Sequence, residues 1–171
     1  MAKMTSAYAN KVLKKLQDDK SFWLSKERDG YLYVAAIDEE PVIPEYDYNQ
    51  ISDEIKNIDR KIVKIKHAIN VINSTSEIEI GDESMTIDQI LISMAQLNNR
   101  RSMLDNMRKQ QEKRRVDSGF YGTRKTAPEY QYVNYSIDEV KKDYEEIDSK
   151  IAAMQIALDK FNQTFEFDVE W

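Results

Sequence analysis

Cysteine is absent from the 171-residue chain. This absence excludes a disulfide framework, a zinc site built on thiolates and a cysteine nucleophile. Glycine and proline are scarce, with four and three positions, so few turns and long helices are expected. The longest apolar run, Tyr31–Ile37, is far too short to cross a bilayer. Because Met1–Tyr8 lacks the apolar core of a secretory signal, we expect a soluble cytoplasmic protein with no membrane partner.

The charge of the chain is high and unevenly distributed. Charged residues make up 33% of the sequence and the net charge is −6, which argues against general nucleic-acid binding as the main role. Between Arg100 and Lys125, however, nine basic residues stand against three acidic ones. A basic stretch in an acidic protein is the first indication of where a function lies.

An isoleucine heptad pattern runs through the second quarter of the sequence. Seven isoleucines alternate at spacings of four and three: Ile51, Ile55, Ile58, Ile62, Ile65, Ile69 and Ile72. This spacing is typical of a long helix in a coiled-coil-like bundle. Similar seams follow later in the chain, where Thr86 with Gln89 and Ser136 with Glu139 read as capping boxes that open two more helices.

We therefore predict an all-α fold, a single-domain antiparallel bundle of long, coiled-coil-like helices with small β-strand or hairpin additions at its ends. The expected elements are a helix over 5–25, an extended segment over 31–44, helices over 48–73 and 86–113, a basic and aromatic connection over 114–135, and a helix over 136–165. Tyr8, Val12, Leu16 and Trp23 are expected on the apolar face of the first helix. A homo-oligomer, most simply a dimer, is expected because the apolar seams need covering.

Two of the predicted helices are followed by short alternating tails. Glu77–Ile80 follows the second helix, and Phe165–Val169 follows the fourth. In an antiparallel arrangement these tails share one pole of the bundle. They are predicted to pair with each other, or with their mates in an oligomer.

The connection from Arg114 to Tyr135 combines cations with aromatic side chains. Tyr130 and Tyr132 alternate, so they are predicted to share one face of a short strand. Guanidinium groups and flat rings are the side chains that hold a phosphate and stack on a base. A purely structural role is the alternative, since arginines near a helix end complement its dipole and tyrosines often cover the end of a bundle.

Two arginines occupy positions in the third predicted helix where the heptad pattern predicts an apolar residue. Arg101 and Arg108 therefore need an internal carboxylate, such as Asp105 or Glu145, or a bound anion, unless they only set helix register. The candidate ligand-binding residues are Arg101, Arg108, Arg114, Arg115, Tyr121, Arg124, Lys125, Tyr130, Tyr132 and Asn134. No catalytic residue, metal ligand or cofactor is assigned, because His67 is the lone histidine and has no second ligand near it in sequence.

Several short motifs resemble one protein family. Lys64–Asn70, Met85–Asp88, Met94–Asn98 with Arg100, Arg101 and Leu104, and Leu158–Thr164 are similar to a family of small bacterial and phage helical proteins. Some members of that family are labelled septicolysin and most are uncharacterised. The resemblance spans Tyr48–Trp171 and implies a helical bundle that oligomerises, without an established activity. The pore-forming role in the label is unsupported, because the chain has no amphipathic span of membrane length.

Three functions fit the sequence. The first is a non-enzymatic oligomeric binding protein that captures a small anionic, nucleotide-like ligand through its Arg/Tyr-rich loop, as a phage anti-defence sponge for a nucleotide immune signal does. The second is a structural scaffold or protein-interaction bundle with no small-molecule ligand. The third, an enzyme such as a phosphodiesterase, is disfavoured because a metal-free mechanism needs a base and His67 is distant in sequence from the basic loop. We expect the first, with a second copy of the chain as partner.

Overall fold

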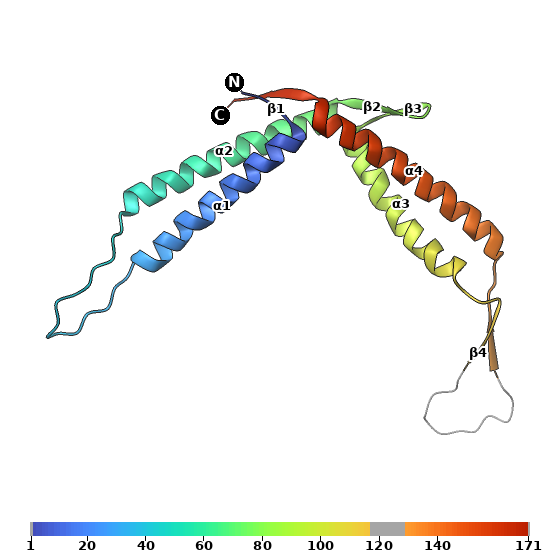
Figure 1. Ribbon diagram of the computed structural model, residues 1–171, viewed down its shortest axis with the longest axis horizontal. Helices are drawn as coiled ribbons and strands as arrows, with labels where there is room; N and C mark the ends of the chain where they lie inside the picture. Colours follow the sequence, from blue (N-terminus) through green and yellow to red (C-terminus); the bar gives the residue numbers. More distant parts are fainter. Residues whose placement is uncertain (1, 117–128, 171) are drawn as a thin grey trace. The chain divides into compact units, whose positions relative to one another are not determined.

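The computed structural model describes residues 2–116 and 129–170. These residues form four helices and three two-stranded antiparallel sheets (Figure 1). The elements in order are β1 (Ala2–Thr5), α1 (Ser6–Gly30), α2 (Tyr48–Thr75), β2 (Glu77–Ile80), β3 (Glu83–Thr86), α3 (Ile87–Arg108), β4 (Lys113–Val116), β5 (Glu129–Tyr132), α4 (Ile137–Thr164) and β6 (Glu166–Val169). They belong to two compact units, Met1–Glu77 with Leu158–Trp171, and Ile78–Ala157.

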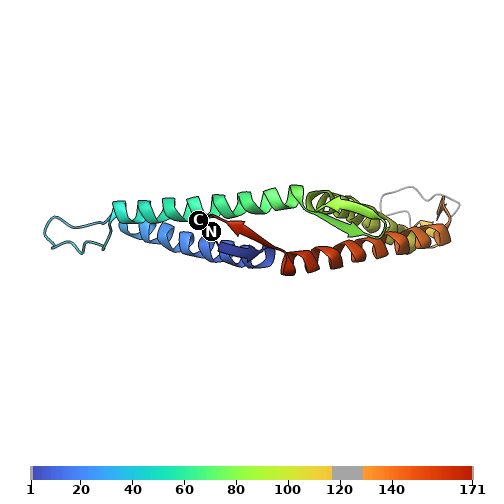
Figure 2. The ribbon, with the colours of Figure 1, turned by 90° about the horizontal axis from the view of Figure 1, so that it is seen from above.

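In the first unit, α1 and α2 lie side by side as an antiparallel pair (Figure 1, Figure 2). The Thr5 hydroxyl caps α1 by accepting a hydrogen bond from the Tyr8 amide at 3.2 Å. Asp47 caps α2 in the same way, accepting from the Gln50 amide at 3.1 Å. An ion pair of 2.6 Å between Lys20 and Asp59 joins the two helices.

The isoleucine seam of α2 lies on the inner side of this pair, as predicted. Ile51, Ile58 and Ile65 are buried, and the other four seam isoleucines are half-buried. The buried residues of α1 are Ser6, Ala9, Leu13 and Leu16. Tyr8 is exposed, so its predicted place on the apolar face is wrong. Small side chains at Ser6 and Ala9 occupy the buried positions instead, which suits a close approach to the neighbouring elements.

Strands β1 and β6 add a small sheet to the helix pair. They run antiparallel, with Ala2 opposite Val169 and Met4 opposite Phe167. Met4, Phe167 and Val169 are buried in the same core cluster as the inner residues of α1 and α2. Strands β1 and β6 therefore lie next to each other (Figure 2), and both contribute side chains to this core.

The connection between α1 and α2, residues 31–47, contains neither helix nor strand. At its base Tyr46 packs closely against Gly30, since a Cβ on Gly30 would stand 2.9 Å from the Cβ of Tyr46. A residue with a side chain does not permit this approach. Partial desolvation, aided by the negative charge of Glu27, raises the pKa of the Tyr46 hydroxyl. The predicted extended segment, 31–44, falls within this connection.

In the second unit, α3 and α4 form another antiparallel pair (Figure 1). The predicted capping box opens α3, with the Thr86 amide donating to the Gln89 side chain at 3.0 Å. The buried apolar residues of this unit are Ile87, Ile90, Leu104, Val140, Ile151 and Met154. Before α3, strands β2 and β3 pair as a short hairpin. Its turn contains Gly81 with a φ of 62°, a conformation that favours glycine.

The prediction of an all-α fold is wrong. Of the residues that the structure describes, 66% are in helices and 15% in strands, a mixed α/β architecture in which small antiparallel sheets accompany the helices. Helix periodicity does not detect β1, because its partner β6 lies at the other end of the sequence. Backbone pairing between distant segments decides whether such short stretches become strands.

Two predicted helix ends are also wrong. Helix α1 does not end at Ser25 but continues to Gly30, where the Tyr31 amide donates to the Glu27 carbonyl at 3.0 Å. Helix α3 ends at Arg108 and not at residue 113, because Lys113–Val116 pairs with β5 as strand β4. The helices predicted over 48–73 and 136–165 agree closely with α2 and α4.

The two alternating tails are strands, but they do not pair with each other. The first is β2, which pairs with β3, and the second contains β6, which pairs with β1. Each tail thus pairs with a different strand from the one predicted. Pairing with mates in an oligomer stays a prediction, as does the behaviour of the two units as a single domain.

Candidate functional site

The hairpin formed by β4 and β5 gathers cations and tyrosines on one face. Its register places Lys113 opposite Tyr132 and Arg115 opposite Tyr130. Because alternate residues of a strand share a face, these four side chains lie together. The Lys113 Nζ lies over the Tyr130 ring, 4.2 Å from its centroid, and 5.6 Å from the centroid of Tyr132. We call these four residues, all exposed, the hairpin face.

The opposite side of the hairpin presents a different group of donors. Arg114 is opposite Gln131 in the register. Both residues line a cavity of about 200 Å³ together with Asn134 and Tyr135. With Gln110 and Gln111 also in its wall, a guanidinium and four side-chain amides surround a small hollow next to the hairpin face.

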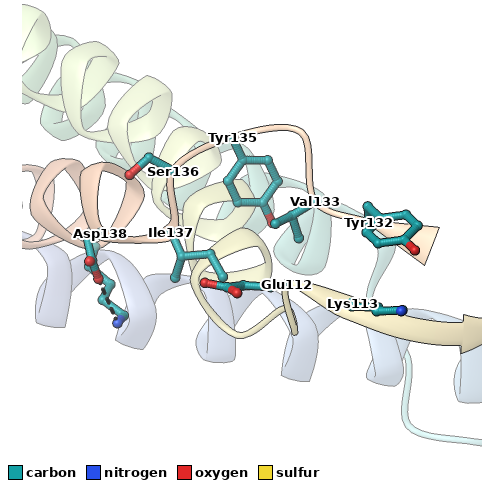
Figure 3. Close-up of a pocket in the computed structure, with 9 residues that line it drawn as sticks. Glu112, Lys113, Tyr132, Val133, Tyr135, Ser136, Ile137 and Asp138 are labelled. Carbon is teal, nitrogen blue, oxygen red and sulfur yellow. Dashed lines mark hydrogen bonds and ion pairs between the residues drawn. The ribbon is translucent and has the colours of Figure 1, made fainter. Parts of the chain in front are cut away.

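A larger cavity, of about 600 Å³, lies at the root of the hairpin (Figure 3). Figure 3 shows that its walls come from the connection after α3 and the start of β4, from the end of β5 and the residues that follow, and from the start of α4. Two lysines and two carboxylates line it, and Lys141 pairs with Asp138 at 3.2 Å. With Glu112 also in the wall, this cavity has no surplus of positive charge. The surplus cations lie on the hairpin itself.

Hydrogen bonds hold the hairpin root against the helices. The Tyr135 hydroxyl donates to the Met107 carbonyl at 2.8 Å, near the end of α3. The Val133 amide donates to the Glu112 carbonyl at 3.2 Å, and Ser136 caps α4 by accepting from the Glu139 amide at 3.3 Å. The residues that precede α4 are thereby anchored on both sides, which gives the hairpin a defined base.

Arg108, one of the two seam arginines, is held by a carboxylate and a ring. Its side chain pairs with Asp105 at 2.7 Å and lies over Tyr144, with the guanidinium carbon 3.9 Å from the ring centroid. Asp105 also binds Lys109. Hydrogen bonds from Lys109 and Arg108 lower the pKa of the Asp105 carboxyl, and Asp105 in turn raises the pKa of Arg108.

Arg101, the other seam arginine, reaches across to α4. It donates to Asp148 at 2.7 Å. Of the two internal carboxylates predicted as partners, Asp105 is correct for Arg108, whereas the acid that reaches Arg101 is Asp148 and not Glu145. Both seam arginines therefore have a carboxylate partner without a bound anion.

The structure divides the ten candidate residues into three groups. Arg114, Arg115, Tyr130, Tyr132 and Asn134 are brought together at the hairpin and the adjoining cavity. Arg101 and Arg108 lie on α3 in carboxylate pairs. Tyr121, Arg124 and Lys125 lie outside the described residues.

Two residues of the site are missing from the sequence prediction. Lys113 lies between the two tyrosines of the hairpin face, and Tyr135 anchors the hairpin root. A sequence signal for Lys113 exists, because it alternates with Arg115 as Tyr130 alternates with Tyr132. No local pattern marks Tyr135, whose partner Met107 is 28 positions away.

Comparison with known proteins places the fold and leaves the function open. No known protein family and no curated protein matches the chain. The fold is similar to that of a functionally unknown conserved protein from Corynebacterium diphtheriae, with a TM-score of 0.63 over 98% of this chain and 100% of that one, at 16% sequence identity. At this identity the similarity shows a shared fold alone. Among the described residues, no helix is long and apolar enough to cross a membrane.

Proposed function

We propose that the protein is a non-enzymatic binding protein that captures a small anionic, nucleotide-like ligand on its hairpin face. The observation that carries this proposal is the placement of Lys113 and Arg115 beside Tyr130 and Tyr132 on one exposed face. A phosphate pairs with the two cations, and a base stacks on a tyrosine ring. The phosphate and the base of a nucleotide thus each have a side chain of matching chemistry on this face.

The seam arginines have a smaller part in this proposal than the sequence indicates. Arg101 and Arg108 already neutralise Asp148 and Asp105. Recruiting either one to a phosphate leaves a carboxylate without its partner, which costs part of the binding energy. Phosphate contact therefore falls to Lys113 and Arg115, with Arg114 available from the neighbouring cavity.

Capture without turnover is part of the same proposal. The lining of the larger cavity contains neither histidine nor cysteine, and His67 is exposed on α2. We therefore expect a bound ligand to leave unchanged. The role as a phage anti-defence sponge for a nucleotide immune signal, the homo-oligomeric state and the cytoplasmic location remain the finer parts of the proposal.

A protein-interaction module with no small-molecule ligand is the second candidate. The connection 31–47 favours it, because Val34, Ile37 and Val42 are exposed there. Exposed apolar side chains in one segment mark a contact surface for another protein. This candidate predicts that substitutions on the hairpin face leave partner binding unaffected unless that face is itself part of the interface.

Native mass spectrometry of the full chain purified from its expression host tests the proposal. After denaturation, an unaltered phosphorylated metabolite in the released fraction supports ligand capture.

A thermal-shift panel of linear and cyclic nucleotides then compares the wild type with Arg115→Ala, with Lys14→Ala on α1 as the matched control. If nothing is released and no nucleotide shifts the melting temperature, ligand capture is wrong and the interaction module takes its place. A chemically converted ligand contradicts the non-enzymatic part.

A further inference from the structure

The connection between α1 and α2 exposes a run of apolar side chains. Val34 is 97% exposed, Ile37 is 102% and Val42 is 90%. Tyr31, Leu32, Tyr33 and Ile43 are exposed as well. Apolar groups this accessible and this close in sequence mark a surface that another molecule covers.

The backbone of this connection is restricted. Tyr46 packs closely against Gly30 at its base, and Pro41 and Pro44 each hold φ near one value. A restricted segment loses less conformational entropy when it docks than a free one does. The connection is thus suited to present its apolar side chains to a partner.

The charge of the connection limits what that partner is. It carries five carboxylates, Asp38, Glu39, Glu40, Glu45 and Asp47, and no lysine or arginine between Tyr31 and Asp47. A lipid surface with anionic headgroups and a nucleic acid both repel such a segment. The partner must combine cations with apolar or aromatic surface.

The β4–β5 hairpin has that combination. Lys113 and Arg115 are exposed in β4, and the rings of Tyr130 and Tyr132 lie on the same face of the hairpin, while Arg114 is exposed on the opposite face. Among carboxylate partners, arginine provides paired donors, and tyrosine rings provide flat surface for aliphatic side chains. The chain therefore carries both halves of a complementary contact.

We infer that the connection 31–47 of one copy docks on the β4–β5 hairpin of a second copy. Carboxylates at Asp38, Glu39 and Glu40 pair with the hairpin cations, while the neighbouring apolar side chains cover the tyrosine rings. This contact rests on the proposed function in one respect, that the hairpin binds anionic groups. It goes beyond that function by naming a second copy of the chain as the occupant.

Charge exchange between two full-length variants tests the contact. The connection variant carries Asp38→Lys, Glu39→Lys and Glu40→Lys, and the hairpin variant carries Lys113→Glu, Arg114→Glu and Arg115→Glu. Each variant alone sets like charges against each other. A 1:1 mixture restores opposite charges at both contacts. The matched control for the hairpin variant, Lys11→Glu, Lys14→Glu and Lys15→Glu, makes the same change of net charge at exposed positions of α1.

Sedimentation equilibrium over a range of protein concentrations measures the outcome. Wild type and control are expected to self-associate equally, each single variant at least about tenfold more weakly, and the mixture at close to wild-type strength. A monomeric wild type overturns the inference. So do variants that associate like the wild type, and variants whose mixture fails to recover. Circular dichroism of each variant checks that the helices are intact.

The same samples separate this inference from the proposed function. If charge exchange restores association while no nucleotide binds the wild type, the contact stands and nucleotide capture fails. The opposite result is that nucleotides bind the wild type but not the hairpin variant, while both charge variants self-associate as strongly as the wild type. In that case nucleotide capture is supported and the contact between copies is wrong. The double variant Val34→Ser, Ile37→Ser tests the apolar part of the contact. It is expected to weaken self-association without changing the charge.

Discussion

The ammonium group of Lys113 lies 4.2 Å from the ring centroid of Tyr130, on the exposed face of a two-stranded hairpin. The contact holds a cation and an aromatic ring at one place, so a ligand with a negative charge next to a flat group meets both at once. Arg115, opposite Tyr130 in the register, adds a second cation. This face is the basis for the predictions on ligand binding.

Removing a ring from the hairpin face is expected to weaken ligand binding. Stacking of a base on an aromatic side chain contributes about 1–3 kcal/mol, so Tyr130→Ala lowers nucleotide affinity by roughly fivefold to 150-fold. Isothermal titration measures the loss. Tyr8→Ala, at an exposed tyrosine of α1, is the control and leaves affinity unchanged. Equal affinities for the two variants contradict stacking on the hairpin.

The pair Arg101–Asp148 is expected to stabilise the second unit weakly and to leave ligand binding alone. Both side chains are at least a third exposed, at 36% and 48%, so a double-mutant cycle of Arg101→Ala and Asp148→Ala gives a coupling of about 0.2–1 kcal/mol in urea unfolding. Nucleotide affinity of Arg101→Ala stays at the wild-type value. A tenfold loss of affinity instead places Arg101 back in the ligand site.

Asp105 is expected to make stability fall in acid. Hydrogen bonds from Lys109 and then Arg108 hold its folded-state pKa below its ordinary value. The stabilisation is therefore fully present above the unfolded pKa of about 3.9, and it is lost as the pH falls through the lower folded pKa. Denaturant unfolding from neutral pH to about pH 2 compares the wild type with Asp105→Asn. Asp105→Asn is expected to lose less stability than the wild type as the pH falls through that range. If the unfolding free energies of the two proteins fall in parallel, Asp105 is not the source of the acid sensitivity.

A side chain at residue 30 is expected to disturb the base of the connection 31–47. In Gly30→Ala the new Cβ meets the Cβ of Tyr46 at 2.9 Å, and this overlap costs about 1–3 kcal/mol, more than the gain in helix propensity. Thermal unfolding of Gly30→Ala, of Tyr46→Gly, which removes the Cβ that the new methyl group meets, and of the double variant measures the effect. The double variant is expected to be more stable than the sum of the two changes implies. If the stability losses of the two single variants add up to that of the double variant, the overlap between residues 30 and 46 is not the cause.

The local sequence pattern is sufficient to predict those parts of the structure whose interactions are between neighbouring residues. The spacing of the isoleucines predicts the inner face of α2, and Thr86 with Gln89 predicts the start of α3, because both depend on residues within one or two helical turns. The alternation of Tyr130 and Tyr132 predicts the strand β5 for the same reason. These parts of the fold and the site follow from neighbouring residues.

Local pattern is insufficient where the partner is distant. Strand β1 depends on β6, at the other end of the chain, and the end of α3 depends on pairing between β4 and β5. Arg101 finds Asp148 rather than Glu145 because helix packing, and not sequence proximity, decides which carboxylate faces it. Each of these outcomes requires a pairing across tens of residues, which periodicity along one element does not report.

Equilibrium binding of linear and cyclic nucleotides to the full chain and to the double variant Lys113→Ala, Arg115→Ala tests ligand capture by the hairpin face most directly. We predict saturable binding to the wild type, binding that is weaker by at least about tenfold in the variant because two charged contacts are lost, and recovery of the nucleotide unchanged. No binding to the wild type by any nucleotide, or equal binding by wild type and variant, contradicts ligand capture by the hairpin face.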